Sequence, residues 1–368
     1  MSTVRFFLGR LAEDRLLLAL LAVFGVLLVL DPARASALPA LVDWRTIAAL
    51  AGLLVLSRGL EDSGVLAHAG RWLLTRVHGE RRLAAALVLF AAALSAVVTN
   101  DVALFIVVPL TVSLCGAARL PVGRLVIFEA LAVNAGSTLS PVGNPQNLFL
   151  WQSSTAGFVE FTLAMLPLAA ALLVLILALV PLGFPARRID LTDPSGPRPL
   201  DRRLMWLSLA LYAPFLLAAE AGHTVWAAVA VIALYLGCAR RVLREVDWLL
   251  LLVFVLMFAD LGLLAGLPWM AGIVPGLVEQ PGGLLLAGAA LSQVISNVPA
   301  TIFLDAFTDD WRTLAWAVAV GGFGTAIGSL ASLIALRLAR QPGLWREFHL
   351  WSLPVLLAAF GLAWWLLP

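Results

Sequence analysis

Uninterrupted apolar runs recur from one end of this 368-residue chain to the other, and many are long enough to span a lipid bilayer. Hydrophobic residues make up 62% of the sequence and charged residues only 12%, a balance that a soluble globular domain of this size does not show. The sequence therefore predicts an all-α polytopic membrane protein, folded as one integrated bundle. The net charge of +2 does not indicate a nucleic-acid partner, and we expect none.

The apolar segments and the arginine pattern together predict a topology. Arginines cluster at the N-terminus and in segments 61–82, 185–203 and 239–247, whereas the intervening loops are poor in arginine. By the positive-inside rule we expect the N-terminus inside and the C-terminus outside, in a multi-pass protein of a bacterial inner membrane. We expect a retained first span, not a cleaved signal peptide, and about nine full spans: 16–31, 44–60, 125–155, 161–183, 204–219, 224–239, 248–264, 313–336 and 350–367.

Two further apolar segments do not fit as spans. Residues 83–115 are bracketed by arginines on both sides, so both ends should face the cytoplasm, and residues 284–305 are bracketed by arginine-poor sequence on both sides. Each segment is predicted to be a re-entrant hairpin that enters and leaves the membrane on one side. Non-helical backbone at that depth is tolerated only where protein buries it or water reaches it.

An internal repeat supports this arrangement. The sequence "LSAVVTNDVALFI" at 94–106 aligns with "LSQVISNVPATIF" at 291–303, and each hairpin precedes an apolar segment interrupted by Gly and polar residues. The hairpins are predicted to enter from opposite sides, and inverted repeats with broken helices are typical of secondary transporters. The chain is predicted to begin with an N-terminal span, 1–40, and to end with a C-terminal span, 346–368. Repeat 1 covers 41–184, with hairpin 83–115 and broken helix 125–155. A cytoplasmic loop, 185–203, separates it from repeat 2, which covers 204–345, with hairpin 284–305 and broken helix 313–336.

Over about residues 40–340 the chain resembles the ion transporter superfamily, which includes arsenite permeases, NhaD-type sodium/proton antiporters, citrate transporters and divalent anion/sodium symporters. "TNDVALFIVVPLT" resembles the hairpin of the permease and antiporter branch, "VGNPQN" is similar to the Gly–Thr–Pro–Pro–Asn element of the symporters, and "IGSLASL" resembles the second broken-helix element of the permeases. The symporters carry Ser–Asn–Thr at both hairpin tips, where this chain has Thr99-Asn100-Asp101 and Ser296-Asn297-Val298. The resemblance implies two sodium or proton sites, an elevator-like transport domain and a homodimer.

Broken helices expose carbonyl groups, which suit Na⁺, and N–H groups, which suit an anion. We expect substrate and ions to be bound at two sites, with Asn147 and Ser332 facing the substrate. The first site is predicted from Thr99, Asn100, Asp101, Ser137, Thr138, Gly143 and Asn144, and the second from Ser296, Asn297, Thr325, Gly328 and Ser329. Within these sets the candidates for Na⁺ coordination are Asn100, Gly143, Asn297 and Gly328. For an isolated Ser or Thr, helix packing is an alternative account.

Several acidic residues lie in or near the spans. Asp101 can bind a cation or carry a proton, and the second hairpin has no equivalent acid. Glu129 and Asp260 are possible proton relays, although Glu129 could instead reach the cytoplasmic edge of the membrane. We expect Glu61 to form a surface ion pair with Arg58.

These features predict a transporter, not an enzyme. The sequence has no zinc-ligand spacing and no phosphate-binding loop for ATP, and an intramembrane protease using Asp101 and Asp260 is a remote alternative, as is a channel. The leading hypothesis is alternating-access transport of a small carboxylate or oxyanion coupled to Na⁺ or H⁺, with no other cofactor. The alternative is Na⁺/H⁺ antiport without an organic substrate, which a carboxylate at the tip of the first hairpin would favour.

Overall fold

The computed structural model describes residues 15–30, 32, 34, 38–74, 76–117, 120–189, 199–339, 341 and 343–367. Within these residues the chain is helical, with one isolated backbone bridge between Gly79 and Arg188, so the all-α prediction is confirmed for this part of the chain. Two arginines of the N-terminal cluster, Arg5 and Arg10, lie outside the described residues, as do residues 190–198 of the loop 185–203.

The helices follow the predicted apolar segments closely and add a few short ones. In chain order they are α2 (Arg15–Leu30), α3 (Leu38–Leu41), α4 (Trp44–Ser63), α5 (Val65–Leu74), α6 (Glu80–Val97), α7 (Asn100–Ala117), α8 (Val122–Ser137), α9 (Pro145–Ser153), α10 (Phe158–Gly183), α11 (Arg202–Glu220), α12 (Thr224–Cys238), α13 (Arg240–Glu245), α14 (Trp248–Ala265), α15 (Pro268–Val278), α16 (Gly283–Ile295), α17 (Asn297–Asp305), α18 (Trp311–Gly321), the 3₁₀ turn η2 (Ala326–Gly328), α19 (Leu330–Ala339) and α20 (Leu344–Leu366).

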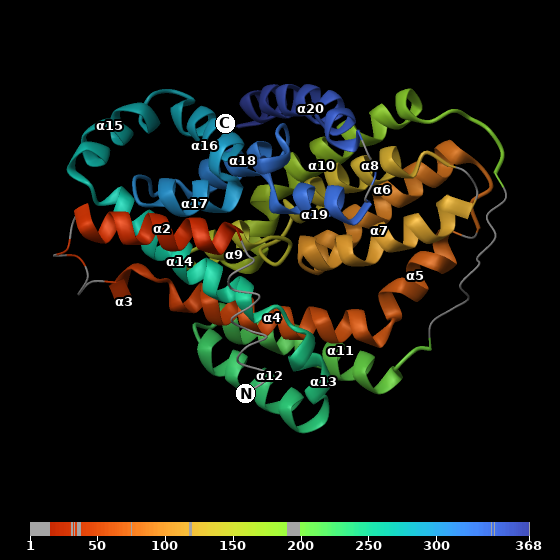
Figure 1. Ribbon diagram of the computed structural model, residues 1–368, viewed down its shortest axis with the longest axis horizontal. Coiled ribbons are helices and arrows are strands. Elements are labelled where there is room, and N and C mark those ends of the chain that lie inside the picture. Colours follow the sequence, from red (N-terminus) through yellow and green to blue (C-terminus); the bar gives the residue numbers. More distant parts are fainter. Residues whose placement is uncertain are drawn as a thin grey trace.

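By length and apolar composition alone, four of the described helices could cross a bilayer: α10, α11, α14 and α20. Of the other predicted spans, some are shorter, such as α2 with 16 residues and α12 with 15, some are interrupted, and α4 has 20 residues but is less apolar. The axes of most helices follow the long axis of the molecule, and α4, α11 and α12 pack together in one layer (Figure 1). Helices α5 and α15, which the sequence patterns did not predict, lie at opposite ends of the molecule (Figure 1).

Arginine-containing segments meet at the end of the molecule near α5. The Asp201 N–H donates to the Ser63 carbonyl at 3.0 Å, and the Glu80 N–H donates to the Arg187 carbonyl at 3.0 Å. The Arg187 side chain also forms an ion pair with the buried carboxylate of Glu80. These contacts place the start of α6, the start of α11 and the segment after α10 at one end of the bundle.

Both segments predicted as hairpins are pairs of helices separated by a very short interruption. Helices α6 and α7 pack against each other and are separated only by Val98 and Thr99, and α16 and α17 pack together with Ser296 at their junction. We call residues 98–101 the first tip and residues 296–297 the second tip. The helix after each pair is interrupted, at residues 138–144 (the first break) and 322–329 (the second break).

Glycines at equivalent places allow each interrupted helix to lie close to the preceding pair. Gly136, one residue before the end of α8, lies so close to α6 that a Cβ there would collide with the Ala92 backbone. Gly321, the last residue of α18, lies in the same way against Ser292 and the Gly288 carbonyl of α16. The same close packing therefore occurs twice, and α6 with α8 and α16 with α18 form extensive contacts.

Replacing Gly136 by alanine is expected to destabilise the protein, because the new methyl group meets backbone and not a movable side-chain end. Overpacking of this kind costs about 1–3 kcal/mol and should lower the thermal unfolding midpoint of the purified protein in detergent. Gly361→Ala in α20 is the matched control, since nothing lies within 4 Å of its added Cβ. That variant should unfold no lower than the unmodified protein. Equal midpoints for Gly136→Ala and the unmodified protein would contradict the observed α6–α8 packing.

Candidate functional site

The first tip and the first break meet inside the bundle. The backbone N–H of Asn100, the first residue of α7, donates to the Gly143 carbonyl at 2.8 Å. The Ser140 hydroxyl donates to the Ala96 carbonyl at 2.6 Å, which ties the same break to the last turn of α6. Two residues that the sequence patterns nominated for one ion site, Asn100 and Gly143, are thus brought together although 43 positions separate them.

Two asparagines hold the first break in shape. Asn144 caps α9, because its Oδ1 accepts from the Asn147 N–H at 2.9 Å while its Nδ2 donates to the Ser137 carbonyl at 3.0 Å. The Asn147 Nδ2 donates to the carbonyls of Ser137, Thr138 and Ser140 at 3.2, 3.1 and 3.2 Å. The side-chain N–H groups of Asn147 are therefore engaged with the backbone, and its role of facing a substrate stays a prediction.

Buried oxygen atoms near the first tip and first break have no hydrogen-bond partner among the described residues. They are the Thr99 hydroxyl, Gln146 Oε1 and Asn147 Oδ1. A buried polar group without a partner costs about 1–3 kcal/mol of stability, so the presence of such atoms needs an explanation. Oxygen atoms of this kind are the ligands that hard cations prefer.

Gln293 of α16 holds the second break in a similar way. Its Oε1 accepts from the Thr325 N–H at 2.8 Å, and its Nε2 donates to the Gly321 carbonyl at 2.8 Å. The Thr325 hydroxyl donates to the Gln293 carbonyl at 3.1 Å and accepts from the Gly328 N–H at 3.2 Å. Thr325 and Gly328, both predicted site residues, are therefore fixed to the end of α16.

Asn134 of α8 joins the two breaks. Its Nδ2 donates to the Gly322 carbonyl at 2.9 Å and to the Ser332 hydroxyl at 3.2 Å, and its Oδ1 accepts from the Ser329 hydroxyl at 3.0 Å. Asn297 of the second tip lies beside the same place, since a Cβ on Gly322 would be 3.2 Å from Asn297 Nδ2. Ser332 is fully buried in this contact, and its role of facing the substrate stays a prediction.

The second tip has a strained backbone and borders a cavity. Ser296 has φ 76° and ψ 157°, a conformation that residues other than glycine rarely adopt and that costs about 1–3 kcal/mol. The adjacent cavity has a volume of about 970 Å³ and runs along α14 between Asp247 and Leu264. Its lining is mostly apolar, with Ser296, Asp247 and Arg337 as polar members.

The predicted acidic residues lie in three different surroundings. Asp101 is in the first turn of α7 and is half-buried. Glu129 is completely buried in α8 and accepts a hydrogen bond from the Thr111 hydroxyl, while its second oxygen has no partner among the described residues. Asp260 of α14 is buried, and neither carboxyl oxygen has a hydrogen-bond partner within the described part of the chain.

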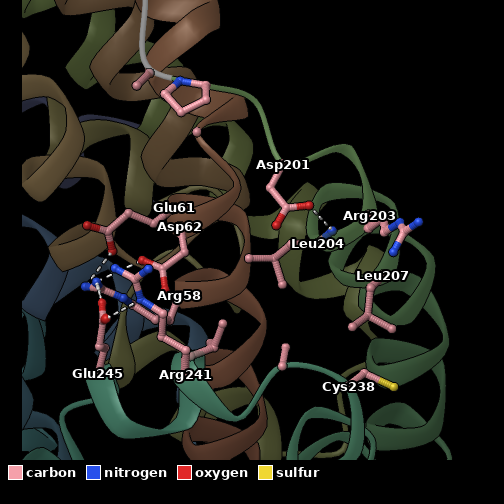
Figure 2. Close-up of a pocket in the computed structure, with 15 residues that line it drawn as sticks. Arg58, Glu61, Asp62, Asp201, Arg203, Leu204, Leu207, Cys238, Arg241 and Glu245 are labelled. Carbon is pink, nitrogen blue, oxygen red and sulfur yellow. Dashed lines mark hydrogen bonds and ion pairs between the residues drawn. The ribbon is translucent and has the colours of Figure 1, made fainter.

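A separate polar pocket lies where α4, α11, α12 and α13 meet, and Figure 2 shows its ion pairs. Arg58 forms the predicted pair with Glu61 at 3.3 Å and also pairs with Asp62 at 2.8 Å and with Glu245. Arg241 donates to Glu245 at 3.0 Å, and this hydrogen bond, followed by that of Arg58, holds the pKa of the Glu245 carboxyl below its usual value. These ion pairs connect the end of α4 to α13. The pocket has a volume of about 840 Å³.

Two central residues, Asn134 and Gln293, were not predicted from the sequence. Both are amides inside otherwise apolar runs, and an amide has three or four hydrogen-bonding positions to satisfy. Asn100 and Asn297 are amides in the same kind of surroundings, so this argument applies to all four residues and could have found Asn134 and Gln293.

Comparison with known proteins indicates a family of transporters. A family model described as Citrate transporter matches residues 10–321. The chain is 46% identical over 355 residues to Inner membrane protein YbiR of Escherichia coli (strain K12), covering 96% of this chain and 95% of that protein. It is 32% identical over 304 residues to Uncharacterized transporter MJ0456 of Methanocaldococcus jannaschii, covering 81% and 82%. It is also 32% identical over 160 residues to Silicon efflux transporter LSI3 of Oryza sativa subsp. japonica, covering 44% and 32%.

Proposed function

Because this chain belongs to the citrate transporter family, a family of membrane transporters, we propose that it moves a small carboxylate or oxyanion across a bacterial inner membrane, coupled to Na⁺ or H⁺. The observation that carries this proposal is the meeting of two tips and two breaks inside the bundle. Helices α6, α8, α16 and α18 end there, and α7, α9, α17 and α19 begin there. Helix C-termini attract cations and helix N-termini attract anions, so both kinds of cargo find partners in one place.

The proposed transport mechanism is alternating access by two inverted repeats with re-entrant hairpins. Its support is the repeated order of elements: a closely packed helix pair, then a helix that a glycine brings against it and that breaks soon after. Paired broken helices near the membrane midplane are the arrangement in which transporters hold substrate and coupling ion. The arginine-containing end near α5 would face the cytoplasm, with the N-terminus inside and the C-terminus outside. We further propose a homodimer.

The proposed ion sites use neutral oxygens. At the first site, Thr99 Oγ1 and Asn147 Oδ1 are buried and have no hydrogen-bond partner in the part of the chain that the structure describes, and the backbone N–H of the tip residue Asn100 binds the Gly143 carbonyl. Na⁺ would complete the bonding of such oxygens without any charged protein ligand. At the second site the corresponding groups would come from Asn297 and Gly328. Glu129 and Asp260, both buried, are the candidates for carrying a proton.

Na⁺/H⁺ antiport remains the second candidate, and Asp101 is the observation that favours it. This carboxylate lies at the first tip, in the first turn of α7. Its negative charge attracts a cation or a proton and repels an anion.

Asp101→Asn is expected to separate the two candidates in proteoliposomes. We expect uptake of one small acid, driven by an imposed Na⁺ or pH gradient, to persist in this variant, because the proposed Na⁺ site is built from neutral oxygens. The solutes to test are citrate, another dicarboxylate and arsenite, together with silicic acid because the rice relative is named a silicon efflux transporter. Asp309→Asn, in an exposed loop, is the matched control.

The opposite outcome is equally clear. Proton movement on addition of Na⁺ alone, reported by a pH dye inside the vesicles and lost in Asp101→Asn but not in Asp309→Asn, would identify an antiporter. In that case uptake of every tested solute should be absent.

A further inference from the structure

We propose that Asn134 is a positioning residue that couples the two breaks, so that a change in the shape of one is transmitted to the other. This inference rests on the proposed function for its meaning, but its evidence is structural. The main-chain carbonyl of Asn134 accepts from the Ser137 hydroxyl at 3.2 Å and from the Thr138 hydroxyl at 2.8 Å, both at the edge of the first break. Its side chain binds the second break. One residue therefore contacts both the edge of the first break and the second break.

Both polar atoms of the Asn134 side chain form hydrogen bonds to residues at or beside the second break. Its Nδ2 donates to Gly322 and Ser332, and its Oδ1 accepts from Ser329, a residue 195 positions away. Asn134 is 5% exposed, Ser329 1% and Ser332 0%. Water has little access to replace a broken bond here, so separating the breaks would leave buried polar groups unpaired.

The side-chain amides of Asn147 and Gln293 each bind groups of one break only. Asn147 binds the carbonyls of Ser137, Thr138 and Ser140, and Gln293 binds Gly321 and Thr325. Among the hydrogen bonds of the described residues, those that join the first break region to the second all involve Asn134. The other contacts between these regions are helix packing, of α8 against α19 and of α9 against α17 and α18, and packing lacks the direction that hydrogen bonds have.

A coupling residue at this place has a consequence for transport. If an ion orders the carbonyls of the first break, the Asn134 side chain carries that order to Gly322 and Ser329, so less ordering remains for binding at the second break. The two sites would then fill cooperatively, and the halves would not change shape separately. The coupling must be reciprocal, because it is a free energy shared by the two sites.

The test is hydrogen exchange measured by mass spectrometry on the full chain in lipid nanodiscs, on peptides that cover 137–147 and 320–332. Asn147→Ala disturbs the first break directly, and Gln293→Ala disturbs the second. We expect each variant to speed exchange in both peptides by about tenfold, corresponding to about 1.4 kcal/mol of lost hydrogen bonding. In an Asn134→Ala background, each should speed exchange only in its own break.

The outcomes are distinct. If the effect of Asn147→Ala reaches residues 320–332 equally with and without Asn134, or never reaches them, the coupling role is wrong. Should Asn134→Ala fail to fold, Ser329→Ala combined with Ser332→Ala removes two of its three side-chain partners and should abolish most of the cross-effect. Exchange in α20 serves as the measure of global stability. The experiment needs no substrate, so a failure of the transporter proposal leaves its result readable.

Discussion

Asn147→Ala is expected to abolish gradient-driven transport and to lower the free energy of unfolding by about 1–3 kcal/mol. The side chain donates to three buried carbonyls of the first break, at Ser137, Thr138 and Ser140. Alanine removes these bonds in a buried place, although the Ser137 carbonyl keeps the Asn144 amide and the Ser140 carbonyl keeps the Gly143 N–H as donors. It also removes the Asn147 Oδ1 that we assign to the first ion site, which has no hydrogen-bond partner among the described residues. Stability and ion binding should therefore fall together.

The measurements are thermal unfolding in detergent and solute uptake in proteoliposomes. Gln152→Ala is the matched control from the same helix, since the Gln152 side chain accepts one hydrogen bond, from the Thr224 hydroxyl at 3.0 Å. We expect that control to lose about 1 kcal/mol and to keep its transport activity. Normal uptake by Asn147→Ala would show that the first break needs neither this brace nor this oxygen.

Glu129→Met combined with Thr111→Val is expected to abolish proton-coupled transport while leaving stability equal or higher. Glu129 is completely buried, its Oε1 accepts from Thr111, and its Oε2 has no partner among the described residues. Replacing both members of a buried polar pair by apolar groups of similar shape is close to neutral or stabilising. A carboxyl in such surroundings is thus better explained by carrying a proton than by stabilising the fold.

The single variant Glu129→Met provides the internal control. It leaves the Thr111 hydroxyl without its acceptor and should be about 1–3 kcal/mol less stable than the double variant. Thermal unfolding and proton flux measured on the same preparations separate the two effects. A double variant that is as stable as the unmodified protein and moves protons at the same rate would exclude Glu129 as a proton carrier.

Several parts of the candidate site were predictable because their signal is local. An interruption of a long apolar run by Gly, Pro and amide residues marks the place where a helix must stop, and the structure ends α8 at Ser137 and α18 at Gly321 within the predicted segments. The tips were predictable for the same reason, since Asn100 and Asn297 each need several partners inside an apolar environment. Short helices such as α5 and α15 lacked this signal, because 10 or 11 residues do not show the length of a span.

The partners of the amides were not predictable. Nothing in the sequence around Asn134 indicates that its side chain reaches Gly322, 188 positions later, or that Asn147 turns its N–H groups back onto the backbone of its own break. The sequence by itself determined where helices begin, break and end, since helix periodicity, chain-breaking residues and the cost of exposing a backbone to lipid act over a few neighbouring residues. Only the tertiary structure decided which carbonyl each buried amide satisfies, because hydrogen bonds are short-ranged and directional and depend on how separate segments pack.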